Sequence, residues 1–173
     1  ADTASDARLS PGASDFTVEA FVHVYNVTSF SLFENRFGSY GTGFVFYKHS
    51  GGNYIVPFFS NVADLATTHQ IPVTVGETFH LAGAREGNVF RVFKDGVQIG
   101  TDITVTGASL DNTKWRLNNR YNDDANPSLD GWIDEARLTI GVARYTSNFT
   151  VPTEAFPNFG YDPYEIVGGV YYP

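Results

Sequence analysis

Apolar and polar residues alternate in several short stretches of the chain, most clearly in residues 15–24. One set of alternate positions is apolar throughout: Phe16, Val18, Ala20, Val22 and Val24. The positions between them are mixed: Thr17, Glu19, Phe21 and His23. Because successive side chains of a strand point to opposite faces, this pattern predicts a strand with one buried and one mixed face.

Other apolar runs, separated by turn-like residues, predict further strands at 29–34, 43–48, 53–60, 115–119 and 131–140. Residues 78–103 predict a meander with strands at 78–85, 89–94 and 97–103, because Asp95-Gly96 favours a type I′ turn. Pro57 cannot donate to a ladder, so its strand should lie at an edge or carry a bulge. The best helical candidate, residues 61–69, predicts a single turn. The whole pattern predicts an all-β sandwich of two antiparallel sheets.

Composition fits a single globular domain of 173 residues, with 15 Phe and 10 Tyr favouring strands. The net charge of −8 argues against a nucleic-acid binder, which needs a basic face. The chain has no Cys, which excludes disulfides and thiolate metal sites. No apolar run approaches the ~20 residues that span a bilayer, so we expect a soluble protein without membrane insertion. The chain also has no Met, so Ala1 would follow a removed segment or begin an excised domain.

Three parts are expected along the chain. Residues 1–14 are small and polar and predict a loose lead-in or a short edge strand. Residues 15–157 form the sandwich. Residues 158–173 are rich in Gly, Pro and aromatic residues, and their apolar side chains should lie either on their own domain or across a neighbouring subunit. The sequence leaves both placements of this tail open.

Three segments resemble one known family. "DFTVEAFV" (15–22) is similar to the opening strand of laminin G-like, concanavalin A-like domains, and "ETFHLAGAREGNVFRVFKDGVQIG" (77–100) to their central hairpins. "LDGWIDEARLTIGVARYTSNFTVPTEAFP" (129–157) resembles their closing segment, above all in bacteriophage virion and tail proteins and related bacterial surface proteins. Phe79 stands where the family usually has Trp. The resemblance implies a jelly-roll sandwich, a fold that hosts lectins, hydrolases and scaffolds alike.

Asp134 and Glu135 are the candidates for acid and base of a glycosidase, but consecutive residues of a regular strand point to opposite faces. No acid lies two positions from either of them. We therefore expect a domain that is not an enzyme. The expected role of Asp134 and Glu135 is structural, in ion pairs with Arg137 and Arg144 or as acceptors of backbone N–H groups.

The loop at residues 118–130 is dense in Asn and Asp, whose oxygens suit a hard cation such as calcium. A calcium site there would use Asp123, Asp124 and Asp130; a solvated turn explains the same residues. A glycan site would combine an aromatic ring with nearby acceptors, and its candidates are Trp132, Tyr121, Asp123, Asp124 and Asn126. The competing interpretation places at least one of Trp115 and Trp132 in the core. No cofactor other than calcium is expected.

Our leading hypothesis for function is a non-catalytic structural or adhesion domain of a phage virion, in a tail, fibre or decoration protein. Such a domain would assemble with other virion proteins and with copies of itself, and would contact glycans of the host surface. The alternative is a secreted, extracellular bacterial lectin domain that binds carbohydrate. A glycoside hydrolase of the same fold ranks last.

Overall fold

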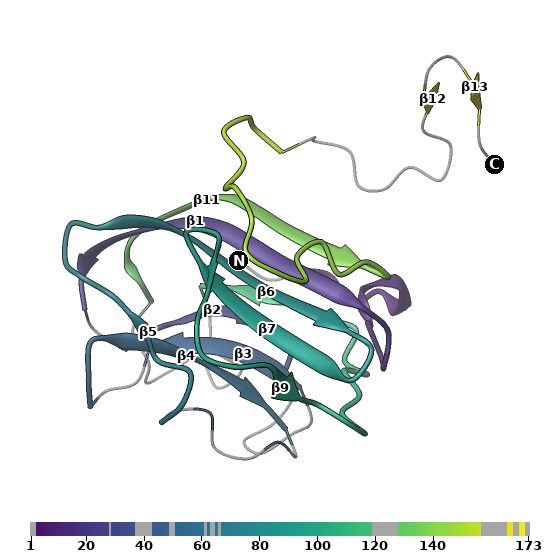
Figure 1. Cartoon of the computed structure of the whole chain (residues 1–173), viewed down its shortest axis with the longest axis horizontal. Coiled ribbons are helices and arrows are strands. Elements are labelled where there is room, and N and C mark those ends of the chain that lie inside the picture. The colour runs from purple at the N-terminus through teal and green to yellow at the C-terminus, as the bar shows by residue number, and fades with distance from the viewer. Residues whose placement is uncertain are drawn as a thin grey trace.

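The computed structural model describes residues 3–27, 29–36, 43–48, 51–60, 62, 65, 67–118 and 128–156, and the backbone of 166–167 and 170–171. Within these residues two antiparallel sheets face each other (Figure 1). In the described part of the chain, no helix is long and apolar enough to cross a membrane. The all-β, two-sheet jelly-roll architecture predicted from the sequence is confirmed.

The first sheet has six strands in the order β11-β1-β6-β7-β8, with β9 also pairing with β7. Their bounds are β1 (Phe16–Asn26), β6 (Thr78–Glu86), β7 (Val89–Lys94), β8 (Val97–Gln98), β9 (Ile103–Thr104) and β11 (Asp130–Ile140). The predicted strand at 97–103 is in fact two short strands, β8 and β9. Gly100, with φ of +72°, lies in the break between them.

The second sheet has five strands in the order β10-β2-β3-β4-β5. Their bounds are β2 (Ser31–Glu34), β3 (Phe44–Lys48), β4 (Tyr54–Phe59), β5 (Ile71–Pro72) and β10 (Arg116–Leu117). Pairing of β4 with β5 ends at Ile55, so Pro57 pairs with β3 alone, as the missing N–H requires. The strand β5 was not predicted, because two residues are too few to show a period.

The core between the sheets is built largely from phenylalanine. The Phe16 ring lies 5.9 Å from the rings of both Phe44 and Phe90, and all three residues are fully buried. Trp115 is 4% exposed, and its indole N–H donates to the carbonyl of Leu9 at 2.8 Å. The alternating set at 16–24 fills this core as predicted: Phe16, Val18, Ala20, Val22 and Val24.

The Asp95-Gly96 turn between β7 and β8 has positive φ at both central residues, +50° and +77°. This is the requirement of a type I′ turn, so the predicted hairpin is confirmed. The Asp95 carboxylate also accepts the backbone N–H of His80 at 2.8 Å, which ties the turn to β6.

The N-terminal lead-in runs beside residues 110–115. Thr3 N–H donates to the Trp115 carbonyl at 2.9 Å, and Gly12 forms an isolated bridge with Leu110. Between these contacts lies a single 3₁₀ turn, η1 (Ala7–Leu9). The lead-in is thus hydrogen-bonded to the domain without adding a strand to either sheet.

The C-terminal part of the described domain, residues 141–156, folds back over the outer face of the six-stranded sheet (Figure 1). We call this segment the strap. Its Tyr145 and Phe149 rings stack on each other and pack on Phe93, on the side of the sheet away from the core. Phe149 N–H donates to the carbonyl of Gly96 at 2.9 Å. Beyond the strap, β12 (Ile166–Val167) pairs with β13 (Val170–Tyr171), and the rest of the predicted tail lies outside the described residues.

Candidate functional site

The outer face of the six-stranded sheet carries its side chains in rows, because paired residues on neighbouring antiparallel strands point the same way. One row joins Trp132 of β11, His23 of β1 and Thr78 of β6. We call Trp132, His23, Thr78 and the adjacent Tyr25 the aromatic row. The strap's contacts lie over other rows of this face, and the aromatic row stays open, with Trp132 40% and Tyr25 57% exposed.

Contacts within the row fix its rings. The Trp132 and His23 rings are nearly parallel, 6° apart, with centroids separated by 5.4 Å. Tyr25 meets His23 edge to face at 4.8 Å. The Thr78 hydroxyl lies 2.7 Å from His23 Nδ1, which holds the imidazole upright. Since β11 is the end strand of this sheet, the Trp132 face away from His23 points past the sheet edge.

Two exposed acids flank Trp132 on its own strand. Asp130 and Asp134 lie two residues before and after it, and alternation places all three on one face. Glycine at 131 allows β11 to approach β1 closely here, since a Cβ on Gly131 would meet the His23 carbonyl at 1.9 Å. The aromatic row therefore combines an exposed indole with carboxylate acceptors.

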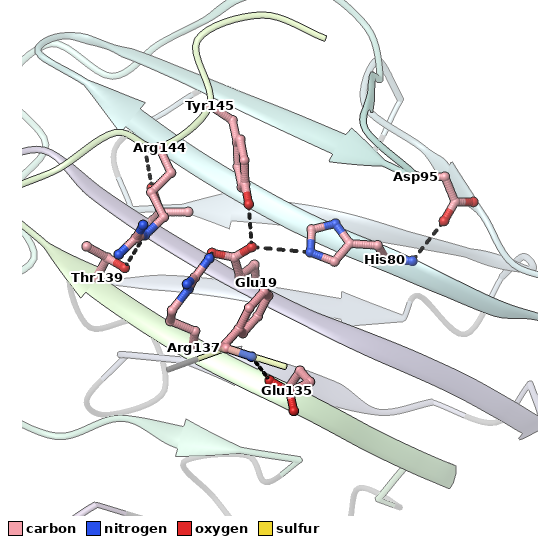
Figure 2. Close-up of polar contacts among 10 residues, drawn as sticks. Glu19, His80, Asp95, Glu135, Arg137, Thr139, Arg144 and Tyr145 are labelled. Carbon is pink, nitrogen blue, oxygen red and sulfur yellow. Dashed lines mark hydrogen bonds and ion pairs between the residues drawn. The ribbon is translucent and has the colours of Figure 1, made fainter. Parts of the chain in front are cut away.

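The Glu19 carboxylate is fully buried beneath the strap (Figure 2). The row of Phe21 separates it from the aromatic row. One oxygen accepts from Arg137, with Nε at 2.8 Å and Nη2 at 2.7 Å. The other accepts the Tyr145 hydroxyl at 2.7 Å and lies 3.2 Å from His80 Nε2. Glu19 thus joins β1, β6, β11 and the strap.

Burial alone would raise the pKa of Glu19, but the hydrogen bonds from His80, Tyr145 and Arg137 outweigh it and lower that pKa below its ordinary value. The pKa of the Tyr145 phenol is raised, first by burial and then by the bond to the Glu19 carboxylate. Glu19 is therefore ionised and Tyr145 protonated at neutral pH. The guanidinium of Arg137 is further covered by Phe156, whose ring centroid lies 3.7 Å away.

His80 is buried between aromatic rings of the sheet and the strap. Phe21 lies 5.0 Å from it and Phe149 5.8 Å, both edge to face. Its Nδ1 has no hydrogen-bond partner among the described residues. These surroundings are those of a packing residue, because no path from solvent reaches a ring that is fully covered.

Asp134 and Glu135, the candidate acid and base of the sequence analysis, lie at a bulge of β11. Pairing with β1 passes from Glu19–Arg137 to Phe21–Asp134, which leaves two residues of β11 opposite one of β1. Glu135 has φ of +51°, and its N–H is held by the Asp134 carboxylate at 2.9 Å. The Glu135 carboxylate accepts the N–H of Phe156 from the strap.

Arg137 and Arg144, the cations expected to pair with these acids, bind other groups instead. Arg137 pairs with Glu19, and Arg144 donates from Nε to the Thr139 hydroxyl at 2.8 Å. Asp134 and Glu135 instead accept backbone N–H groups, which was the second role expected of them. The sequence did not identify Glu19 because its partners lie 61 to 126 residues away along the chain.

The loop candidates fall largely outside the described residues: Tyr121, Asp123, Asp124 and Asn126. Of the glycan candidates, Trp132 is described and exposed, while Trp115 is the tryptophan of the core. Of the calcium candidates, Asp130 is described and exposed at the start of β11. The described residues contain no group of three or more His, Asp or Glu side chains placed to hold a metal ion, and the calcium site stays a prediction.

A family model described as the concanavalin A-like lectin/glucanases superfamily matches residues 2–141. No curated protein matches the chain in sequence. Among solved structures, a sialidase of Trypanosoma rangeli in complex with 2,3-difluoro-KDN is 13% identical, with a TM-score of 0.57. That match covers 73% of this chain and 20% of the sialidase chain, so this chain spans about a fifth of that protein.

Two further structures match over more of their own length. The CBM40 of a Ruminococcus gnavus IT-sialidase, bound to α2,3-sialyllactose, is 12% identical over 78% of this chain and 80% of its own, with a TM-score of 0.56. Domains LG4-5 of the mouse laminin α1 chain are 12% identical over 89% of this chain and 44% of theirs, with a TM-score of 0.55. At such identities these likenesses show a shared fold. With the family model matching most of its length, the chain belongs to the concanavalin A-like lectin/glucanase superfamily.

Proposed function

We propose that this domain binds carbohydrate without cleaving it, through the aromatic row on the outer face of the six-stranded sheet. The observation that carries the proposal is Trp132: a tryptophan 40% exposed in mid-strand, braced by a parallel His23 ring and flanked by exposed acids. The Trp132, His23 and Tyr25 rings form one contiguous aromatic surface, and contiguous exposed apolar surfaces mark interaction sites.

The chemistry of the row suits a pyranose ring. The C–H face of a sugar packs on the negative face of an aromatic ring, and the sugar hydroxyls donate to nearby acceptors. Trp132 supplies the ring, while Asp130 and Asp134 supply carboxylates on the same face. His23 and Thr78 lock the indole in place, which lowers the entropy lost on binding.

Four carboxylates, those of Asp130, Asp134, Glu19 and Glu34, are poorly placed for hydrolysis. Asp130 and Asp134 are four residues apart on one strand, roughly 13 Å, whereas glycosidase pairs are about 5–9.5 Å apart. Glu19 is fully buried and occupied by Arg137, Tyr145 and His80. Glu34, also buried, accepts the Arg36 Nε at 3.0 Å.

The comparisons support this proposal at the level of fold. The Ruminococcus gnavus module has a sialylated glycan bound, and this chain matches four-fifths of its length. The T. rangeli sialidase is an enzyme, but the match covers a fifth of its chain. The shared sandwich is therefore compatible with a binding module, and the aromatic row gives this chain its own surface for that role.

The test is a glycan array probed with the wild-type chain and with Trp132→Ala. We expect binding to at least one glycan class and its loss, by about tenfold or more, in the variant, because the stacking surface is removed. Val97→Ala, which truncates another exposed apolar side chain, on β8, is the control and should bind normally. Retained binding by Trp132→Ala would reject this surface. Turnover of a polysaccharide that is lost in Asp134→Asn would reject the non-catalytic role.

The expected role in a phage virion, with virion proteins and copies of the chain as partners, stays a prediction, as does the alternative of a secreted lectin. Both are compatible with a glycan-binding domain. Purification of the assembly that contains this chain would decide between them.

A further inference from the structure

We infer that the aromatic row selects neutral and cationic sugars and rejects anionic ones, such as sialic acids and uronic acids. This inference rests on the proposed carbohydrate binding and specifies its ligand class. It sets this chain apart from its structural neighbour that has sialyllactose bound. The inference comes from the charges around Trp132.

The groups nearest to the indole on its own strand are acidic. Asp130 and Asp134 flank Trp132 on the same face, and both are exposed. Neither forms an ion pair with a described cation; the Asp134 carboxylate accepts the Glu135 N–H. Both carboxylates keep acceptor capacity toward a ligand, so hydroxyl and ammonium donors are favoured there.

The neighbouring cations are already occupied. Arg137, the next basic residue along β11, is held by Glu19 and covered by Phe156. Lys94, on the core side of β7 opposite Leu81, pairs with Glu77 at 2.6 Å and donates to the Pro72 carbonyl. In the described surroundings of the row, no arginine fork faces Trp132, and such a fork is what recognises a carboxylate bidentately.

His23 is the remaining basic residue of the row. One of its ring nitrogens is engaged by Thr78, and its ring face is covered by Trp132. The aromatic row and its two flanking acids, Asp130 and Asp134, include no lysine or arginine. An anionic sugar stacked on Trp132 would then meet repulsion from both sides, while an amino sugar would gain from both carboxylates and from the indole face.

The first experiment measures the electrostatic potential around Trp132 without any glycan. Trp115 is buried, so collisional quenchers in low salt at pH 8 report on Trp132. We divide each quenching slope by that of free N-acetyltryptophanamide and expect the resulting value for Cs⁺ to exceed that for iodide by at least about twofold, with acrylamide as the neutral reference. The double variant Asp130→Asn/Asp134→Asn should bring the two slopes together. Asn keeps an oxygen to accept the Glu135 N–H, so the bulge is retained.

The matched control is Glu86→Gln/Asp111→Asn, which removes the same net charge from exposed positions elsewhere. Glu86 ends β6 next to Arg85, which pairs with Phe16 at the start of β1. Asp111 follows Leu110, which bridges Gly12 just before β1 begins, whereas the aromatic row lies near the end of β1. This control should leave the Cs⁺ preference in place. Equal quenching by Cs⁺ and iodide in the wild type, or the loss of the preference in the control, would overturn the inference even if the chain binds glycans.

The second experiment compares probes that differ in charge: lactose with α2,3-sialyllactose, methyl-esterified with free oligogalacturonate, and chitosan with chitin oligosaccharides. We expect the less negative member of each bound pair (lactose, the methyl ester and protonated chitosan) to bind at least about fivefold more tightly, and Asp130→Asn/Asp134→Asn to reduce that ratio. Tighter binding of the anionic members would overturn the selectivity and leave carbohydrate binding intact. Binding to none of the six probes would overturn both.

Discussion

At the scale of single residues, the buried carboxylate of Glu19 binds more side chains than Asp134 or Glu135 does. Glu19 binds a guanidinium, a phenol and an imidazole; His80 is fully buried, and Arg137 and Tyr145 are partly buried. Burying a charge is costly unless it is paired and hydrogen-bonded, and here every oxygen of the carboxylate is engaged. Losing the charge would leave Arg137 beneath Phe156 without its counterion.

We therefore predict that Glu19→Gln lowers the free energy of unfolding by about 3–5 kcal/mol, the usual cost of breaking a buried pair. Glu86→Gln removes an exposed partner of Arg91 and should cost about 1 kcal/mol or less. Urea denaturation at pH 7 measures both. A loss below that of Glu86→Gln would contradict this account of Glu19.

The same variant gives a pH dependence whose sign is fixed. The pKa of Glu19 is lower in the folded protein than its ordinary value, so its ionisation stabilises the fold at pH values above that ordinary value. This contribution is lost as the pH falls through the lowered pKa of the folded state. The stability difference between wild type and Glu19→Gln should therefore narrow in acid. A difference that stays constant from pH 7 into the acid range would show that charge is not the cause.

At the scale of elements, the strap covers part of the outer face of the six-stranded sheet. It is held at Thr17 by Arg144 N–H, at Gly96 by Phe149 N–H and at Glu135 by Phe156 N–H. It covers the row of Glu19 and leaves the aromatic row open. The bulge at Glu135 also bends the end strand β11, which protects its edge from pairing with another chain.

Alanine substitutions at two glycines distinguish the cost of backbone strain from the cost of displacing the strap. Gly96 and Gly107 have nearly the same φ, +77° and +75°, but a Cβ on Gly96 would lie 2.0 Å from the Phe149 carbonyl, whereas one on Gly107 meets nothing within 4 Å. We predict that Gly107→Ala costs about 1–2 kcal/mol from φ alone and Gly96→Ala clearly more. Hydrogen exchange should show faster exchange of strap amides in Gly96→Ala only. Equal effects of the two variants would mean that the strap adds nothing at this turn.

At the scale of the whole molecule, the two sheets share one phenylalanine core and should unfold together. Phe16 and Phe90 of one sheet touch Phe44 and Phe59 of the other, and Trp115 packs against this cluster. In Trp132→Phe the fluorescence comes from Trp115, and its unfolding transition should coincide with that of far-UV circular dichroism. Separate midpoints would show that the sheets are independent cooperative units.

The local sequence pattern by itself determined the strand β1, the turn at Asp95-Gly96 and the superfamily. Alternation in residues 15–24 predicts β1 and its buried face, Asp95-Gly96 predicts the type I′ turn, and the closing segment predicts the superfamily. These features depend on residues that are neighbours in sequence, where strand period and turn geometry act directly. The bulge at Glu135 gave no such signal, because a positive φ at a glutamate has no sequence signature.

Only the tertiary structure decided which charges meet and which tryptophan is exposed. Arg137 was expected to pair with its neighbours in sequence, but strand register places it opposite Glu19, 118 residues away. Trp115 and Trp132 lie in similar short strand-like runs. One packs between the sheets, and the other stands on an end strand beyond the reach of the strap. Alternation tells which residues share a face, but the order of strands and the path of the strap decide what covers that face.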